Sequence, residues 1–397
     1  MKLGASHLSY CTNIHPGESW DEIRGNLERY LPQVKRRVSP GASFGVGLRL
    51  SAAAARSLDS VEARAQFAAF LRDEDLYVFT INGFPYGPFH GTRVKEDVYL
   101  PDWRDSGRLE YTNRLADLLA SWVGPGADAT GSISTVPGAF KPNAATADAI
   151  DRIVDGLLRH AAHLVAIERE TGKRIVLALE PEPCCLLETV AETVDFFRTH
   201  LHSDTAAARL AELADVAPVT AHEVLRRHLG VCLDLCHAAV EFEDPAHCLE
   251  ALDHAGIAIA KIQVTAGLRI PEVSAAAVDA LRALADAVYL HQVVERGAGG
   301  LRRYVDIEDA CASDSWCAGR CEWRVHFHVP VFLENLEQFS STQPFVREAL
   351  ALHKRQPVTP HLEVETYTWS VLPARHRTAP VEDAIARELQ WVQGELA

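Results

Sequence analysis

The sequence has no long apolar run, and no window approaches eighteen uninterrupted apolar residues. A helix that crosses a bilayer needs about 20 such residues, so we expect no direct membrane insertion. The N-terminal stretch "MKLGASHLSYCTNIHPG" also lacks the apolar segment of a secretory signal. These two absences predict a cytoplasmic protein.

Runs of basic residues with interleaved aromatic residues are absent as well, and the formal net charge is −15. Clustered Lys and Arg side chains hold nucleic-acid phosphates, so we expect no nucleic-acid partner. Low-complexity tracts are also missing. What remains is a chain of 397 residues with 48% hydrophobic content, which is enough to bury a large core.

The nine cysteines do not form a recognisable metal module. Cys311, Cys317 and Cys321 have the spacing C-x5-C-x3-C, which differs from the paired C-x-x-C motifs of structural zinc sites. We expect ordinary thiols here, and a structural metal or a disulfide stays an open alternative.

Short apolar segments alternate with longer amphipathic ones, which is typical of repeated βα units. Good helices are expected at 105–123, 146–172, 271–290 and 381–396. Eight βα units close a barrel of this size, so the sequence predicts an α/β protein with a (β/α)8 TIM barrel and extra helices. The nine strand-like segments are 7–14, 43–51, 76–83, 131–136, 174–180, 229–236, 260–267, 324–332 and 361–369.

Nine segments leave one strand surplus to the barrel. We expect a single domain over 1–397 with insertions at about 200–228 and 285–325. The second insertion contains a hairpin around Gly297–Gly300.

Polar residues collect where the expected strands end, and chemistry in such barrels lies at those ends. Carboxylates, imidazoles and an amide there suit Zn²⁺, Mn²⁺, Fe²⁺ or Co²⁺. A divalent ion would also neutralise the two crowded acids of "LALEPEP". The candidate metal ligands are Glu180, Glu182, Asp234, Gln263, His326, His328, Glu363 and Glu365. The candidate substrate-binding residues are Asn13, His15, Asn82 and Lys261.

Simpler interpretations exist for each of these residues. An E-x-E pair at a strand end can cap the following helix, and His237 alone can be a core histidine. Lys261 can be a catalytic amine or half of a buried ion pair, and we favour the pair.

Several motifs resemble the xylose isomerase-like TIM barrels, which include sugar isomerases, ketose 3-epimerases and endonuclease IV. "LALE" resembles the metal-binding end of the fifth strand in the epimerases, and "LDLCH" supplies Asp234 with His237 three residues later. On the seventh strand Arg269 matches the family's Arg, while Gln263 stands where the family has a metal-binding His. The resemblance implies a metal Glu and a catalytic Glu six residues later. Glu182 and Glu188 have that spacing and Glu180 has the better local context, so the choice stays open.

A closer resemblance is to the EboE-type "metabolite traffic" proteins of that superfamily. It rests on "HLSYCTNIHPGESW", "SISTVPGAF", "LEPEPCCLLET", "KIQVTAGLR", "HFHVPVF" and "EVETYTWSVLP" and covers nearly the whole chain. The resemblance implies processing or traffic of a secondary metabolite beside a membrane-protein partner of the same pathway. We infer that His326 or His328 replaces the missing strand-seven histidine.

The sequence therefore favours a metal-dependent isomerase or epimerase of a small polyhydroxylated or cyclic metabolite. Carboxylates would move the proton in pairs, and His237 and Arg269 would stabilise the enediolate oxygen. The candidate catalytic residues are Glu182, Glu188, His237, Arg269 and Glu365, with Glu363 as the alternative to Glu365. A non-catalytic metabolite-binding or carrier protein is the alternative function, since the amide of Gln263 is a weaker ligand than imidazole. Phosphoester hydrolysis is a weaker third possibility because of the acidic surface.

Overall fold

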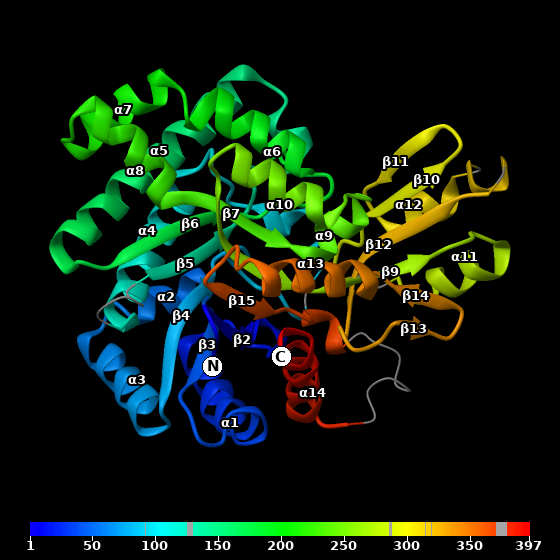
Figure 1. Cartoon of the computed structure of the whole chain (residues 1–397), viewed down its shortest axis with the longest axis horizontal. Helices are drawn as coiled ribbons and strands as arrows, with labels where there is room; N and C mark the ends of the chain where they lie inside the picture. The colour runs from blue at the N-terminus through cyan, green and yellow to red at the C-terminus, as the bar shows by residue number, and fades with distance from the viewer. Residues whose placement is uncertain (92, 125–129, 286–287, 314, 319, 371–378) are drawn as a thin grey trace.

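The chain folds into a parallel barrel with a second sheet beside it (Figure 1). The structure is a computed structural model that describes residues 1–91, 93–124, 130–285, 288–313, 315–318, 320–370 and 379–397. Among these residues no helix is both long and apolar enough to cross a membrane.

Eight parallel strands build the barrel, which confirms the predicted fold class. In spatial order they are β2 (Ser6–Tyr10), β15 (His361–Val364), β8 (Ala258–Val264), β7 (Leu229–Asp234), β6 (Arg174–Leu179), β5 (Thr130–Thr135), β4 (Leu76–Asn82) and β3 (Phe44–Arg49). The short β1 (Lys2–Leu3) pairs antiparallel with β2.

A serine side chain closes the seam between β2 and β3. The Ser9 hydroxyl donates to the Gly45 carbonyl at 2.6 Å and accepts from the Gly47 N–H at 3.0 Å. Cys11 and Gly47 form one parallel bridge beside it. The serine side chain thus takes the place of backbone hydrogen bonds between β2 and β3, the two strands that close the barrel.

Amphipathic helices cover the outside of the barrel (Figure 1). Helix α5 shows how the sequence sets their ends, because the Thr146 hydroxyl caps its first turn and Gly172 ends it at a φ of 70°. The helices are α1 (Trp20–Val38), α2 (Ala52–Ser57), α3 (Val61–Asp73), α4 (Ser106–Trp122), α5 (Ala147–Thr171), α6 (Val190–Phe196), α7 (Asp204–Ala214), α8 (Pro218–His228), α9 (Leu235–Val240), α10 (Pro245–His254), α13 (Gln343–Arg355) and α14 (Val381–Leu396).

The second sheet lies between β8 and β15 in the chain and is antiparallel. Its order is β11 (Gly300–Tyr304), β10 (Val293–Gly297), β12 (Glu322–Val329), β9 (Ala266–Ile270), β14 (Phe339–Ser341) and β13 (Asn335–Leu336). Two short helices accompany it, α11 (Ala275–Arg282) and α12 (Ile307–Ala312).

This excursion is wider than the 285–325 that we expect from the sequence. It starts at Ala266, because β8 runs almost directly into β9, and it ends at Ser341. The hairpin around Gly297–Gly300 is present as β10 and β11. The surplus strand is β12, and it carries "HFHV" beside the barrel instead of within it.

Candidate active site and metal centre

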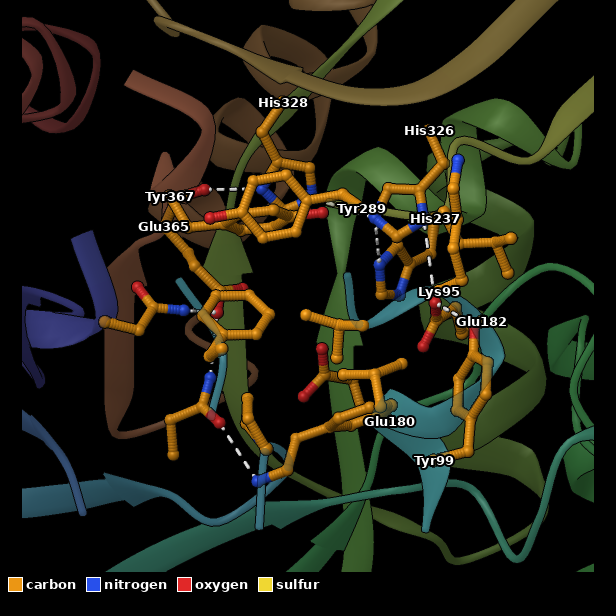
Figure 2. Close-up of a pocket in the computed structure, with 18 residues that line it drawn as sticks. Lys95, Tyr99, Glu180, Glu182, His237, Tyr289, His326, His328, Glu365 and Tyr367 are labelled. Carbon is orange, nitrogen blue, oxygen red and sulfur yellow. Dashed lines mark hydrogen bonds and ion pairs between the residues drawn. The ribbon is translucent and has the colours of Figure 1, made fainter. Parts of the chain in front are cut away.

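A pocket opens at the carboxyl ends of the barrel strands, and residues of the second sheet form part of its lining (Figure 2). The space between its walls, including the open solvent at its mouth, is about 540 Å³. Polar groups line one part of it and aromatic rings the rest. The lining residues are Asn13, Asn82, Phe84, Pro85, Phe89, Val94, Lys95, Val98, Tyr99, Glu180, Glu182, His237, Tyr289, Leu290, His326, His328, Glu365 and Tyr367.

Three imidazoles meet at one side of this pocket. His237 comes from α9, which follows β7, while His326 and His328 come from β12 of the second sheet. The Nε2 atom of His326 lies 3.1 Å from Nε2 of His237 and 3.1 Å from Nε2 of His328. The two sheets therefore share one cluster, and Figure 2 shows the rings facing one another.

The hydrogen bonds at Nδ1 decide which ring nitrogens carry a proton. Nδ1 of His237 faces the Pro181 carbonyl at 2.9 Å, and Nδ1 of His328 faces the Glu365 carbonyl at 2.7 Å. A carbonyl can only accept, so both Nδ1 atoms donate. In the neutral ring the Nε2 atom then carries a lone pair.

His326 has the same tautomer for a different reason. Its Nδ1 lies 2.7 Å from Oε1 of Gln292, and the Gln292 amide is oriented because its Nε2 donates to the Pro183 carbonyl at 3.1 Å. The Gln292 oxygen must then accept from His326. Burial lowers the pKa of His326 well below its ordinary value, and it lowers the pKa of His328 to about 4. The Nε2 lone pairs of His326 and His328 thus face each other at 3.1 Å, and Nε2 of His237 lies 3.1 Å from that of His326.

Carboxylates form a second group next to the imidazoles. Oxygens of Glu180, Asp234 and Glu365 lie within 4.8 Å of one another, and all three residues are buried. Glu180 Oε2 and Asp234 Oδ2 are enclosed and accept no hydrogen bond. Burial, and after it the charge of neighbouring carboxylates, raises the pKa of Glu180 and of Glu365 well above the ordinary value.

Asp234 caps helix α9 with one carboxylate oxygen, and its other oxygen accepts no hydrogen bond from the described residues. Its Oδ1 accepts from the Thr265 hydroxyl at 2.5 Å and from the backbone N–H groups of Cys236 and His237 at 2.7 and 3.1 Å. Helix capping therefore accounts for only one of its two oxygens. Oδ2 lies 3.9 Å from Nε2 of His237.

Glu182 lies beside His326 and accepts hydrogen bonds from neighbouring side chains. Its Oε1 accepts from the Tyr99 hydroxyl at 2.7 Å and from Gln292 Nε2 at 3.1 Å, and it lies 3.6 Å from Nδ1 of His326. Burial raises the pKa of Glu182 despite these donors. A buried carboxyl of raised pKa in a pocket is a candidate for proton transfer.

These donors fit a divalent metal ion. A cation between the Nε2 atoms would relieve the repulsion of their lone pairs, and it would compensate the unpaired oxygens of Glu180 and Asp234. Imidazole with carboxylate is a ligand set that suits Zn²⁺, Mn²⁺, Fe²⁺ or Co²⁺. Each imidazole also has an acceptor at Nδ1, which is how metal-binding histidines are normally oriented.

Four predicted site residues lie deeper in the barrel or beside it, away from the pocket. Lys261 donates to Glu363 at 2.6 Å and neither is exposed, so the buried pair is observed and neither can touch a substrate or the ion. Gln263 is buried and accepts from the Cys232 thiol at 3.1 Å. His15 stacks on Tyr30 at 4.2 Å between ring centres, in the core.

Glu188 and Arg269, which the sequence predicts as catalytic, do not line this pocket. Glu188 forms an ion pair with Lys141 and accepts from the Cys184 N–H at 2.7 Å, since the chain turns away after Glu182. Arg269 lies on β9, where it donates to Glu322 at 2.8 Å. Because β9 follows β8 directly and belongs to the second sheet, Arg269 lies away from the mouth of the barrel.

Sequence reasoning missed the aromatic wall and its hydrogen-bond donors. Tyr99 follows a segment without periodic pattern, and Tyr289 and Gln292 precede the hairpin that we expect to be peripheral. "EVETYTW" contains Tyr367 two residues after Glu365, which was a usable signal. Lys95 lines the pocket and pairs with Asp306 at 2.5 Å.

Cys311 and Cys321 are free, buried thiols. The side chain of Cys317 lies outside the described part of the chain.

A scan of protein-family models gives no match, and a search of curated proteins gives none. Among solved structures the chain is similar to a xylose isomerase-like TIM barrel protein from Mycobacterium smegmatis in complex with magnesium. The identity is 13% over 98% of this chain and 100% of that one, with a TM-score of 0.47. It is also similar to an IOLI protein with a bound zinc atom, at 11% identity over 98% and 97% of the chains and a TM-score of 0.47. A third is a probable 3-DHS dehydratase from Bacillus anthracis, at 14% identity over 97% of each chain and a TM-score of 0.44. At such values the likeness concerns the fold, so the chemistry is argued from this chain's own residues.

Proposed function

We propose that this protein is a divalent-metal-dependent isomerase or epimerase of a small cyclic or polyhydroxylated metabolite. One observation carries the proposal. Three imidazole Nε2 atoms meet beside two buried carboxylate oxygens that accept no hydrogen bond from the described residues, at the carboxyl end of the barrel. Such a set is costly to bury unless a cation and a substrate complete it.

The residues divide the work between binding and proton transfer. A bound divalent ion supplies a Lewis acid that polarises a carbonyl oxygen. Glu182 accepts both of its hydrogen bonds at Oε1, which leaves Oε2 to take a proton from a substrate carbon. Asn13 and Asn82 donate to Oε1 of Glu365 at 2.6 and 2.8 Å and so fix its orientation.

The apolar side chains beside these groups favour a ring over an open chain. Phe84, Phe89, Tyr289, Leu290 and Tyr367 face the pocket with apolar surface. Phe89, Tyr289 and Tyr367 pack together with ring centres 5.1 to 5.3 Å apart. An aromatic wall removes the apolar face of a cyclic compound from water, while the polar side receives its oxygens.

The metabolic setting is part of the same proposal. The motifs that resemble EboE-type proteins support a role in the processing or traffic of a secondary metabolite, beside a membrane-protein partner of the pathway. A fold of this kind hosts many chemistries, so the fold alone supports neither part of the proposal. The site residues support the isomerase or epimerase reaction, and the motifs support the role in secondary metabolism.

The test is solvent exchange with the metal-loaded protein. We expect the carbon-bound hydrogen next to the carbonyl of a cyclic hydroxyketone substrate to exchange with deuterium from D₂O. Glu182→Gln should abolish that exchange. Glu188→Gln is the matched control and should retain it, because Glu188 is held outside the pocket by Lys141.

Suppose that the protein binds a metabolite tightly and that no carbon-bound hydrogen of this metabolite exchanges with D₂O. That result would contradict the catalytic proposal. That result would support the metabolite-binding or carrier function instead.

A further inference from the structure

Three arginines of the second sheet share one carboxylate, that of Glu322 on β12. Their shortest N–O distances to this carboxylate are 2.8, 3.0 and 2.9 Å. We name them the arginine cluster, and they are Arg269 on β9, Arg296 on β10 and Arg324 on β12. The strand register brings them together, because Arg324 pairs with Arg269 and Arg296 pairs with Glu322.

Glu322 balances only part of the charge of the arginine cluster. Its Oε1 accepts from Arg269 and Arg324, and its Oε2 accepts from Arg269 and Arg296, so both oxygens are used. Burial alone would raise the pKa of Glu322, but hydrogen bonds from Arg269 and Arg324 lower it to about 2. Three positive charges against one negative charge leave two positive charges, on a chain whose formal net charge is −15.

The surroundings do not supply the missing negative charge. Among the described residues, Glu322 is the one carboxylate in ion-pair contact with the arginine cluster. Glu241, at the end of α9, is already paired with Arg303 at 2.5 Å. Like charges that face each other on adjacent strands are destabilising, and the charges of Arg269 and Arg296 act with burial to lower the pKa of Arg324.

A residue in a rare backbone conformation holds two of these arginines in place. Phe242 follows α9 with a φ of 60°, which a bulky residue seldom adopts. Its ring centre lies 4.4 Å from the guanidinium carbon of Arg296 and 4.1 Å from that of Arg324. Such a contact stabilises a guanidinium group without neutralising it. Backbone strain of this kind is typical of functional sites, and here it keeps two positive charges side by side.

The arginine cluster lies outside the pocket, although β12 contributes to both. None of its arginines lines the pocket. Arg324 precedes His326 by two residues on β12, so the two side chains leave the strand on the same side, about 6.6 Å apart along it. Helix α9 lies against both, since its Ala239 carbonyl accepts from Arg324 at 2.6 Å and its His237 meets His326.

We propose that the arginine cluster binds a phosphate monoester at a site separate from the pocket. This group carries a charge of about −1.5 to −2 at pH 7, which matches the two uncompensated positive charges, and guanidinium groups bind phosphate oxygens in pairs. The side chains of Arg269 and Arg324 are only 34% and 16% exposed, which favours a small soluble phosphate over a flat lipid surface. The inference goes beyond the proposed function and does not depend on it.

The test is calorimetric titration of the protein with glycerol 3-phosphate at constant ionic strength. We expect saturable binding that Arg296→Gln weakens by about tenfold or more, because a charge-assisted hydrogen bond is lost. Arg296 is suited to this test because its side chain is 51% exposed and two arginines remain on Glu322. Arg302→Gln is the matched control and should bind as the wild type does. Arg302 pairs with Glu295 on β10 and therefore lies on the opposite face of the sheet from Arg296.

Glu322→Gln tests the charge in the opposite direction. It removes the one negative charge and should tighten binding by about tenfold, as one unit charge near the phosphate would at a protein surface. If this variant fails to fold, the exposed Arg296→Gln decides.

Vesicles of phosphatidylcholine with phosphatidic acid form the second arm of the experiment, and we expect no binding to them. Vesicle binding that Arg296→Gln abolishes, without binding of glycerol 3-phosphate, would assign the site to a lipid headgroup and overturn the soluble ligand. No saturable binding in either arm would overturn the site itself. Equal weakening in Arg296→Gln and Arg302→Gln would show only general charge attraction. Phosphate held in the pocket would bind Arg296→Gln unchanged, and either of these two results would also overturn the site.

Discussion

Glu363 on β15 and Glu365 just after its end are two residues apart and still have different surroundings. Side chains two apart on a strand share a face and lie about 6.6 Å apart along it. Glu365 therefore reaches the pocket, while Glu363 lies one layer deeper against Lys261. The alternation of the strand shows that both acids point inward. It does not show the depth of either, because depth depends on the stagger of neighbouring strands.

At this scale the Lys261–Glu363 pair allows a sharp stability test. Lys261→Met should lower the free energy of unfolding by about 3–5 kcal/mol, because it leaves the Glu363 charge buried without a partner. Lys261→Met combined with Glu363→Leu should recover much of that loss. Urea unfolding of the two variants measures both effects. Equal losses in the single and double variants would show that the pair is not the cause.

Asn13 should matter for metal affinity without touching an ion. Its amide donates to Glu365 Oε1 at 2.6 Å, and the loss of such a supporting hydrogen bond typically costs about 10–100-fold in metal affinity. We expect Asn13→Ala to weaken metal binding by that factor, measured by competition with a chelator. Asn143→Ala is the control, because Asn143 does not line the pocket, and it should bind metal as the wild type does. An unchanged metal affinity in Asn13→Ala would show that Asn13 does not support metal binding through Glu365.

At the scale of elements, β3 depends on a residue without a side chain. A Cβ atom at Gly47 would lie 2.1 Å from Glu363 Oε1 and 2.6 Å from the Tyr10 carbonyl. Gly47→Ala should therefore destabilise the protein by about 3 kcal/mol or more, at or above the upper range for overpacking, because the added methyl would also displace a buried ion pair. Gly25→Ala in α1 meets nothing within 4 Å and should stabilise it by about 0.5–1 kcal/mol. Denaturant unfolding that gives both variants the same sign would contradict this.

Helix α14 carries a carboxyl that makes its packing depend on pH. Glu388 is buried and accepts from the Thr366 hydroxyl and the Val331 N–H, yet burial raises its pKa to about 7. The unfolded chain releases this proton near pH 4.5, so the folded state binds more protons between about pH 4.5 and 7. The contribution of Glu388 to stability is then fully present below pH 4.5 and decreases as the pH rises through 7, by about 3 kcal/mol.

Glu388→Gln keeps the acceptor oxygen and cannot ionise. We expect this variant to gain stability relative to the wild type at pH 8 and to lose that advantage at pH 5. Thermal unfolding at the two pH values measures the difference. Glu382→Gln, on the partly exposed first turn of the same helix, should show no such change.

At the scale of the whole molecule, the sequence predicts the barrel better than the site. Buried strands alternate with amphipathic helices over the chain, and each pattern is local. The second sheet depends on pairings between β9, β12 and β14 that are 53 to 73 residues apart, and no local pattern records them. For this reason His326 and His328 are predictable as polar neighbours on one strand face. Their approach to His237, and the displacement of Arg269 from the site, are not.

His237 of the barrel meets His326 and His328 of the second sheet, so a bound metal ion should change the mobility of the second sheet more than that of the barrel. His237 belongs to the barrel and His326 to β12, and their Nε2 atoms lie 3.1 Å apart. Without an ion their lone pairs repel, and with one they become ligands of the same centre. We expect chelation to accelerate amide hydrogen exchange in β10 and β12 while β4 and β5 keep their protection, because β4 and β5 carry none of the candidate metal ligands. In His328→Asn the chelator should have less effect on β12. Acceleration spread evenly over both sheets would mean that the ion stabilises the fold as a whole and does not act as a link between its two parts.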